Sequence, residues 1–217
     1  MRKVIYSVML LICSQTVSAD VIRSAVSATA SSEFNSDYSI TRAINQSGLS
    51  SGYVSGSDNF YSYLATNPSH TPIASYYEWF TEFGVRSAVA TFDLGSLYSL
   101  TAAALWAEEA WGPHSGVSFL VSKNGVDFTS IMNNLTLIDN PASSSYTASI
   151  YNFGAVNARY FQISFGNCSQ DGCSLGEIAF NTSDATSETP SVSAPLSSSL
   201  IMIGLAGLYF RRKMSAA

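Results

Sequence analysis

Apolar and polar residues alternate in short runs along the middle of the chain, with the two-residue period of a β-strand. The run 117–128 shows this pattern most clearly. Asn124 and Gly125 interrupt it, and such a pair favours a type I′ turn, in which both central residues have positive φ. The pattern therefore predicts a β-hairpin with a two-residue turn, whose register is fixed by the turn. The expected cross-strand pairs are Val121 with Phe128 and Ser122 with Asp127.

Similar runs recur at 90–94, 100–106, 161–165 and 175–180, separated by Gly, Asn, Ser or Pro. In the last run we expect Ile178 and Phe180 to face inward and Glu177 to face the opposite way. No long run with a helical period lies between the two ends of the chain. The predicted fold class is all-β, with about eight antiparallel strands.

Many aromatic residues occupy an irregular region at 53–86. Two interpretations stay open: the rings cover the end of the core, since large rings dominate burial, or they form a stacking surface for sugars or another flat ligand. The aromatics of this region are Phe60, Tyr61, Tyr63, Tyr76, Tyr77, Trp79, Phe80 and Phe83.

The N-terminus is typical of an exported protein. Arg2 and Lys3 precede the apolar run 4–12, and small residues at 17–19 suit a signal peptidase. We expect a signal peptide at 1–19. A lipoprotein at Cys13 is the alternative, although isoleucine precedes this cysteine.

A polar linker at 183–195 leads into a C-terminal segment at 196–217. Its apolar part would span about 21 Å as a helix, short of the roughly 30 Å hydrocarbon core. The order of proline, apolar run and the basic cluster 211–213 resembles the PEP-CTERM sorting tail of Gram-negative bacteria. The resemblance implies an exosortase-type processing enzyme and an envelope or extracellular location. A plain membrane anchor with positive-inside charges is the alternative.

The composition and net charge of the chain limit the classes of molecule that it can bind. The 217 residues are 47% hydrophobic and 12% charged, enough for one or two domains with a core. Five of the ten basic residues lie in the two terminal segments, whereas all fifteen acidic residues lie between them, so the mature part carries 5 − 15 = −10. This charge argues against nucleic acid as a partner.

Cys168 and Cys173 flank a turn-forming spacer in an exported chain, which predicts a disulfide. A metal site is the alternative, but two thiols without a nearby histidine make a poor zinc shell. The two histidines, His70 and His114, lie in loop contexts without any hydrolase or metalloprotease motif, and we expect both at the surface. Adjacent carboxylates at 108–109 point apart on an extended segment. The chain is therefore predicted not to be an enzyme.

Several strings occur in the order they have in the discoidin, or coagulation factor 5/8 type C, family: SATASSEF, AIN with QSGL, FDLGSLYSL, ALW, GVSFLVSKNGVDF, ARYFQISF and LGEIAF. The chain resembles this family over residues 20–182. The resemblance implies a jelly-roll β-sandwich of the galactose-binding type with ligand loops at one end. The first loop has Asn45-Gln46 where the family has an acidic residue, and the aromatic region is longer than usual.

The resemblance implies a calcium ion between the first loop and the closing strand. Its expected ligands are Asn45, Ser47, Ser50 and Glu177; alternatively, Glu177 binds loop amides without an ion. Exposed loop aromatics would stack on a sugar, and the candidate ligand-binding residues are Trp111, Trp79, Tyr77 and His114. The expected function is a non-catalytic module that binds envelope or extracellular polysaccharide. A structural matrix or surface protein is the alternative.

Overall fold

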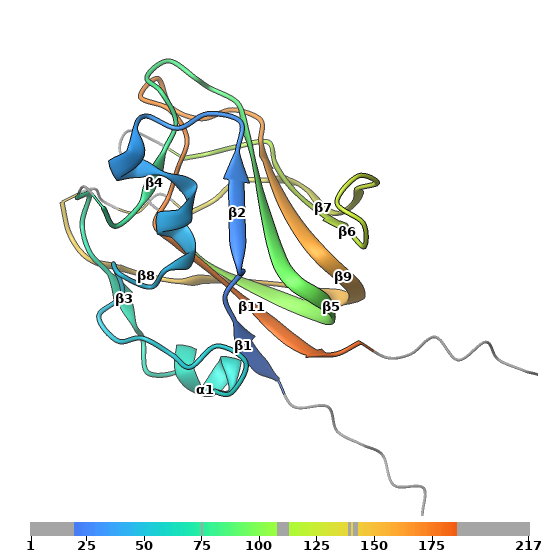
Figure 1. Cartoon of the computed structure of the whole chain (residues 1–217). Coiled ribbons are helices and arrows are strands. Elements are labelled where there is room, and N and C mark those ends of the chain that lie inside the picture. Colours follow the sequence, from blue (N-terminus) through green and yellow to red (C-terminus); the bar gives the residue numbers. More distant parts are fainter. Residues whose placement is uncertain (1–19, 75, 108–112, 139, 141–142, 186–217) are drawn as a thin grey trace, which may run out of the picture. The chain divides into compact units, whose positions relative to one another are not determined.

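The computed structural model describes residues 20–74, 76–107, 113–138, 140 and 143–185 (Figure 1). The strands in this part pair antiparallel, as expected for the predicted all-β class. Helical structure is limited to the short helices η1 (Ser36–Tyr38), η2 (Ile40–Ile44) and α1 (Phe60–Leu64) within the described ranges. The strands there are β1 (Val21–Arg23), β2 (Ser27–Ala30), β3 (Ser69–His70), β4 (Trp79–Phe80), β5 (Ala88–Trp106), β6 (Val117–Ser122), β7 (Thr129–Leu135), β8 (Tyr146–Thr147), β9 (Ser149–Phe165), β10 (Ser174–Leu175) and β11 (Glu177–Asp184).

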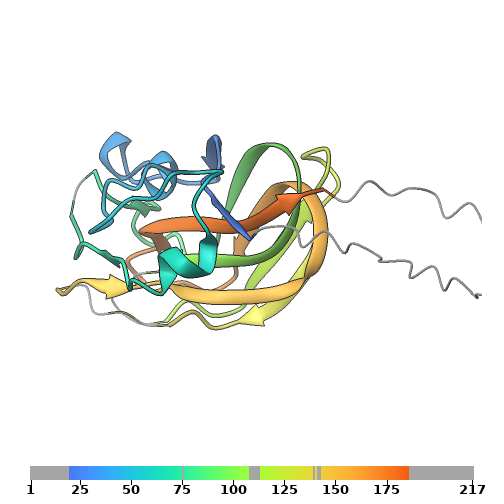
Figure 2. The ribbon, with the colours of Figure 1, turned by 90° about the horizontal axis from the view of Figure 1, so that it is seen from below.

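One large sheet, in the order β1-β11-β5-β9-β6-β7 with β2 beside β5, forms the body of the domain. Its two long strands, β5 and β9, curve back through a tight bend, which Figures 1 and 2 show clearly. The first half of β5 pairs with β2 and the second half with β11. The bend thus divides the sheet into two halves that face each other as the layers of a β-sandwich.

Large apolar side chains from both halves fill the space between them. Phe92 and Phe161 come from one half and Phe180 from the other, with ring centroids 6.2 Å and 5.0 Å from that of Phe180. All three rings are buried, as is Ile178. The predicted inward direction of Ile178 and Phe180 is therefore confirmed.

The predicted strands 90–94 and 100–106 are parts of one strand, β5. Gly95 has a φ of 81° where the pairing register shifts, so the strand turns sharply without ending. Arg159 on β9 donates two hydrogen bonds of 2.8 Å to Asp93 on β5, which ties the strands together beside the bend. The guanidinium holds the pKa of Asp93 below its usual value.

The outer face of β11 and β5 is also covered. Phe60 on α1 and Tyr63 pack with Tyr53 and Trp106 over this face, and all four are buried. Glu177 lies on this side, opposite Ile178 as predicted, but it is covered as well. Phe60 and Tyr63 therefore cover the core, which is one of the two interpretations of the aromatic region.

The hairpin forms, but its predicted register is wrong. Val121 pairs with Thr129 and not with Phe128, so residues 123–128 make a longer loop. Of the expected turn pair, only Gly125 has a positive φ, of 77°. The reason is the Asn124 side chain, whose Oδ1 accepts hydrogen bonds from two loop amides at 2.9 and 3.0 Å. This side-chain capping competes with the tight turn.

No helix among the described residues is long and apolar enough to cross a membrane. The predicted signal peptide and sorting segment lie outside these residues.

Candidate ligand-binding site

An aromatic groove opens to solvent where the chain leaves β2 and where β4 ends. Its volume is about 200 Å³. The lining is mostly apolar, with one carboxylate and the hydroxyl groups of one threonine and one tyrosine. We call this feature the aromatic groove, and it is lined by Phe34, Tyr38, Ile73, Phe80, Thr81, Phe83 and Asp171.

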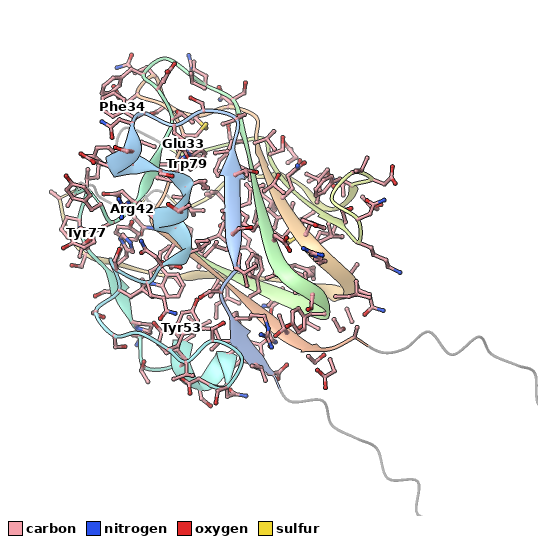
Figure 3. All side chains as sticks on the ribbon, in the orientation of Figure 1. Glu33, Phe34, Arg42, Tyr53, Tyr77 and Trp79 are labelled. Carbon is pink, nitrogen blue, oxygen red and sulfur yellow. A yellow bond between two sulfur atoms is a disulfide. The ribbon has the colours of Figure 1, made fainter. Side chains whose placement is uncertain are left out.

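Four of these residues form a connected series of rings. Phe83 and Phe34 have centroids 5.0 Å apart, Phe34 and Tyr38 5.9 Å, and Tyr38 and Phe80 5.4 Å. Each pair is edge-to-face, the arrangement that the quadrupoles of aromatic rings favour. Phe34 is 41% exposed and Phe83 70% exposed, so two of the rings are presented to solvent. Figure 3 shows Phe34 at the margin of the domain.

Three hydrogen bonds, each with at least one main-chain group, connect the segment 32–34 to the segment 79–82. The Phe34 N–H donates to the carbonyl of Phe80 at 2.8 Å, and the Glu82 N–H donates to the Ser32 hydroxyl at 3.1 Å. Trp79, on the same short strand as Phe80, donates from Nε1 to the Ser32 carbonyl at 3.0 Å. The segment 32–34 therefore acts as a neighbour of β4, although it is far from it in sequence.

A disulfide stabilises the other wall of the groove. Cys168 and Cys173 are bonded, as predicted, with Cα atoms 5.1 Å apart. The Cys173 N–H donates to Thr81 Oγ1 at 2.9 Å, and the Thr81 N–H donates to the Cys173 carbonyl at 3.0 Å. These bonds fix the loop that carries Asp171 against the end of β4. Closing so short a loop contributes on the order of 2 kcal/mol in the chain-entropy description.

Of the predicted ligand-binding residues, Tyr77 is 37% exposed and lies at the edge of the domain (Figure 3). The prediction that Trp79 is exposed is wrong. Its ring is buried, 5.5 Å from that of Phe165, because β4 pairs with β10 and draws the ring into the core. Trp111 lies outside the described residues, and its role stays a prediction.

The prediction that both histidines lie at the surface is also wrong. His114 is 1% exposed, and its Nε2 accepts a hydrogen bond from the Ser174 N–H at 3.1 Å. Burial lowers the pKa of His114 to about 4, so the ring is neutral at neutral pH. A fully buried imidazole cannot contact a ligand in the groove, but it supports β10, whose Ser174 pairs with Phe80.

His70, on β3 beside Tyr146 of β8, is completely buried. The Tyr146 hydroxyl lies 3.0 Å from Nδ1, and the Tyr77 carbonyl lies 3.1 Å from Nε2. Burial lowers the pKa of His70. Nδ1 also lies 3.1 Å from the Thr71 carbonyl. Whichever nitrogen of the neutral ring carries the proton can therefore donate to a main-chain carbonyl, that of Thr71 or that of Tyr77, so His70 helps to position the backbone beside the exposed tyrosines.

Glu177 lies in a second, closed environment. It is fully buried, and its Oε2 accepts a hydrogen bond from the Gln46 N–H at 2.8 Å. Burial raises the pKa of Glu177 well above its usual value and raises the pKa of nearby Tyr63 to about 12. Glu177 thus accepts a hydrogen bond directly from a loop amide, as expected if it binds the loop without an ion.

The fit of the four predicted calcium ligands is partial. Glu177 Oε1 is buried without a hydrogen-bond partner, so this oxygen has a lone pair that could bind a cation. Asn45 Oδ1 already accepts from the Ser47 N–H and hydroxyl, and the Ser50 hydroxyl accepts from the Ser69 N–H. No group of three His, Cys, Asp or Glu side chains suited to a metal occurs in the described part of the chain. Main-chain carbonyls would have to supply the remaining ligands.

In the sequence, Phe80 and Phe83 stand out only as members of a larger aromatic set, and the groove residues Phe34, Tyr38 and Asp171 do not stand out at all. The available signal was the string SSEFNSDY, in which two aromatic residues interrupt a polar segment. Nothing local indicated that this string lies beside residues about 50 positions later.

Comparisons with known proteins find no matching family model and no matching curated protein sequence. Among solved structures, chitosan-binding module 1 from a chitosanase/glucanase of Paenibacillus sp. IK-5 is 18% identical, with a TM-score of 0.49, covering 73% of this chain and 95% of that one. The family 32 carbohydrate-binding module of Clostridium perfringens NanJ, solved with galactose, is 15% identical, with a TM-score of 0.48, covering 72% and 97%. Because these identities and scores are low, the ligand class is inferred from this chain's own groove.

Proposed function

We propose that this protein is an exported, non-catalytic module that binds carbohydrate of the envelope or extracellular polysaccharide through the aromatic groove. The observation that carries the proposal is the groove itself, in which exposed Phe34 and Phe83 stand beside the polar groups of Thr81 and Asp171. Apolar walls with a few placed polar groups are typical of small-ligand sites. Exposed apolar clusters on a soluble domain mark interaction surfaces, which favours binding over a purely structural role.

Removing either exposed ring should abolish most of the binding. We expect Phe34→Ala and Phe83→Ala to weaken binding to the best glycan of an array by roughly tenfold or more, as for a central aromatic contact. Melting temperature should change little for Phe83→Ala, because that side chain is 70% exposed. Glycan-array binding, followed by titration calorimetry and thermal melts, measures both effects.

Tyr61→Ala is the matched control, because Tyr61 is 42% exposed on α1, away from the groove residues. Trp111→Ala belongs in the same series, since the expected stacking role of Trp111 is otherwise untested. Full binding by both groove variants would refute this location of the site.

We also propose that the chain is exported by its signal peptide and processed at its C-terminal segment by an exosortase-type enzyme in a Gram-negative envelope. The mature protein should then end near Pro195 and lack the basic residues 211–213. Intact-mass measurement on protein from the native host checks this. A full-length C-terminus would instead indicate a membrane anchor.

Calcium at Glu177 is a further proposal, supported by the unpartnered buried oxygen of this carboxylate. Millimolar calcium should then raise the melting temperature of the wild-type protein by a few degrees, by mass action on the folded state. Glu177→Gln should remove that rise. In chelator, the same variant should be at least as stable as wild type at pH 7, because a neutral amide avoids the cost of burying a charge.

Glu82→Gln, at an exposed glutamate, is the control and should respond to calcium as wild type does. Equal melting temperatures in calcium and in chelator would leave Glu177 as a hydrogen-bond acceptor for the Gln46 amide alone.

A further inference from the structure

The rings of the aromatic groove are steeply inclined to one another. The interplanar angles are 73° for Phe34 with Phe83, 64° for Phe34 with Tyr38, and 87° for Tyr38 with Phe80. A flat stacking platform would need neighbouring rings that share a plane. Rings at these angles instead act as walls around a small volume, into which they can direct their electron-rich faces.

Asp171 is the single charged residue among the seven that line the groove. Its backbone N–H contacts the Ser169 hydroxyl, but its carboxylate forms no ion pair with any Lys or Arg of the described chain. Arg86, on an adjoining loop, donates to the Cys168 carbonyl at 3.2 Å. The groove therefore combines aromatic faces with an uncompensated negative charge.

Both features attract the same kind of ligand. An ammonium ion within about 6 Å of a ring centroid is stabilised by the quadrupole of the ring, and several rings together form a cage for it. A carboxylate at the same place adds direct attraction, and the net charge of −10 on the mature part favours the approach of cations. An anionic sugar would meet repulsion from both sources.

We infer that the aromatic groove binds an organic ammonium group, held by the faces of Phe34 and Phe83 and by the Asp171 carboxylate. The volume of about 200 Å³ is smaller than the roughly 300–1,000 Å³ of pockets for drug-sized ligands, so it suits one head group or one sugar ring. The ammonium can come from a protonated amino sugar, in which case the inference rests on the proposed carbohydrate function, or from a choline-type group.

Titration calorimetry on the exported protein at low salt can separate these cases. The probes are a glucosamine trimer, an N-acetylglucosamine trimer, a galacturonic acid trimer, a neutral galactoside and choline. We expect the glucosamine trimer to bind at least tenfold more tightly than its acetylated counterpart, which has lost the charge, and the galacturonic acid trimer not to bind. Choline binding shows that the ammonium suffices, whereas its absence shows that the sugar ring is also required.

Two variants test the two parts of the cage. Asp171→Asn should weaken glucosamine binding by about 3- to 30-fold, with Asp184→Asn, at an exposed carboxylate on β11, as the control. Phe83→Leu keeps apolar bulk but removes the π face, so it should lower the affinity for the charged probe by a similar factor and leave the melting temperature unchanged.

The outcomes also separate this inference from the proposed function. Equal affinity for the neutral, acetylated and charged sugars, unaffected by Asp171→Asn, would overturn the ammonium inference while supporting a carbohydrate module. Binding of choline with no sugar bound would support the ammonium site and overturn the carbohydrate function. If no probe binds and the array is also blank, both are overturned.

Discussion

Replacing Gly48 with alanine is expected to destabilise the domain by about 2–3 kcal/mol, a fall in melting temperature of roughly 5–10 °C. A Cβ at Gly48 would overlap the His70 ring, 2.5 Å from Cε1 and 2.7 Å from Cδ2. The ring cannot move aside easily, because its nitrogens contact Tyr146 and Tyr77 and it is fully buried. Gly176 closes the other side, where a Cβ would lie 3.0 Å from the same ring.

Gly154→Ala is the matched control for thermal melts, since a Cβ at Gly154 in β9 meets nothing within 4 Å. It should be neutral. Combining Gly48→Ala with His70→Ala should cost less than the sum of the two single changes, because the added methyl then fills part of the space left by the ring. A Gly48→Ala protein as stable as the Gly154→Ala protein would show that His70 is not held in place.

The strands could be predicted where large apolar residues alternate. Phe161, Ile163 and Phe165 leave only one face of β9 that can be buried, so the period alone fixes their direction. The sharp bend of β5 could not be predicted in the same way. Gly95 suggested the end of a strand, and only the pairing of β5 on both sides of Gly95 shows that the strand continues.

The predictions of the hairpin register and of exposed histidines are wrong for the same reason. The turn propensity of Asn124 concerns its backbone conformation. In the structure, its side chain instead accepts hydrogen bonds from two loop amides. Likewise, the loop-like sequences around His70 and His114 predict surface positions, yet His70 lies on β3 and both side chains are buried. Side-chain hydrogen bonds and loop packing depend on partners far away in sequence, which local patterns do not report.

The candidate site was predicted only in part for the same reason. Phe80 and Phe83 belong to the aromatic set that suggests a binding surface, but their partner Phe34 is one of only two aromatic residues in a polar segment. The disulfide was predictable because its two cysteines are five residues apart and need no distant element. The groove, in contrast, depends on contacts between distant segments, such as the hydrogen bond from the Phe34 N–H to the Phe80 carbonyl.

Acidification should destabilise the domain through His114. Its pKa is about 4 in the folded state and about 6.5 when the chain is unfolded, so the unfolded chain binds the proton more tightly. The stability that depends on the neutral ring is complete above pH 6.5 and is lost as the pH falls toward 4, by about 3 kcal/mol in total. The physical cause is burial, and the bond from the Ser174 N–H exists only while Nε2 is unprotonated.

His114→Gln isolates this contribution, because the amide oxygen of glutamine can accept the Ser174 hydrogen bond and does not titrate. Denaturant unfolding at a series of pH values should give a difference between wild type and variant that is constant above pH 6.5 and shrinks by about 3 kcal/mol down to pH 4. Wild type must be compared with the variant because Glu177 changes the pH dependence of stability in the opposite direction. Its raised pKa makes the folded state more stable as the pH falls toward 4.5. Lost packing against Phe165, whose ring lies 5.7 Å from that of His114, would shift the variant equally at every pH. A difference that does not change with pH would therefore show that His114 is not held neutral by its burial beside β10.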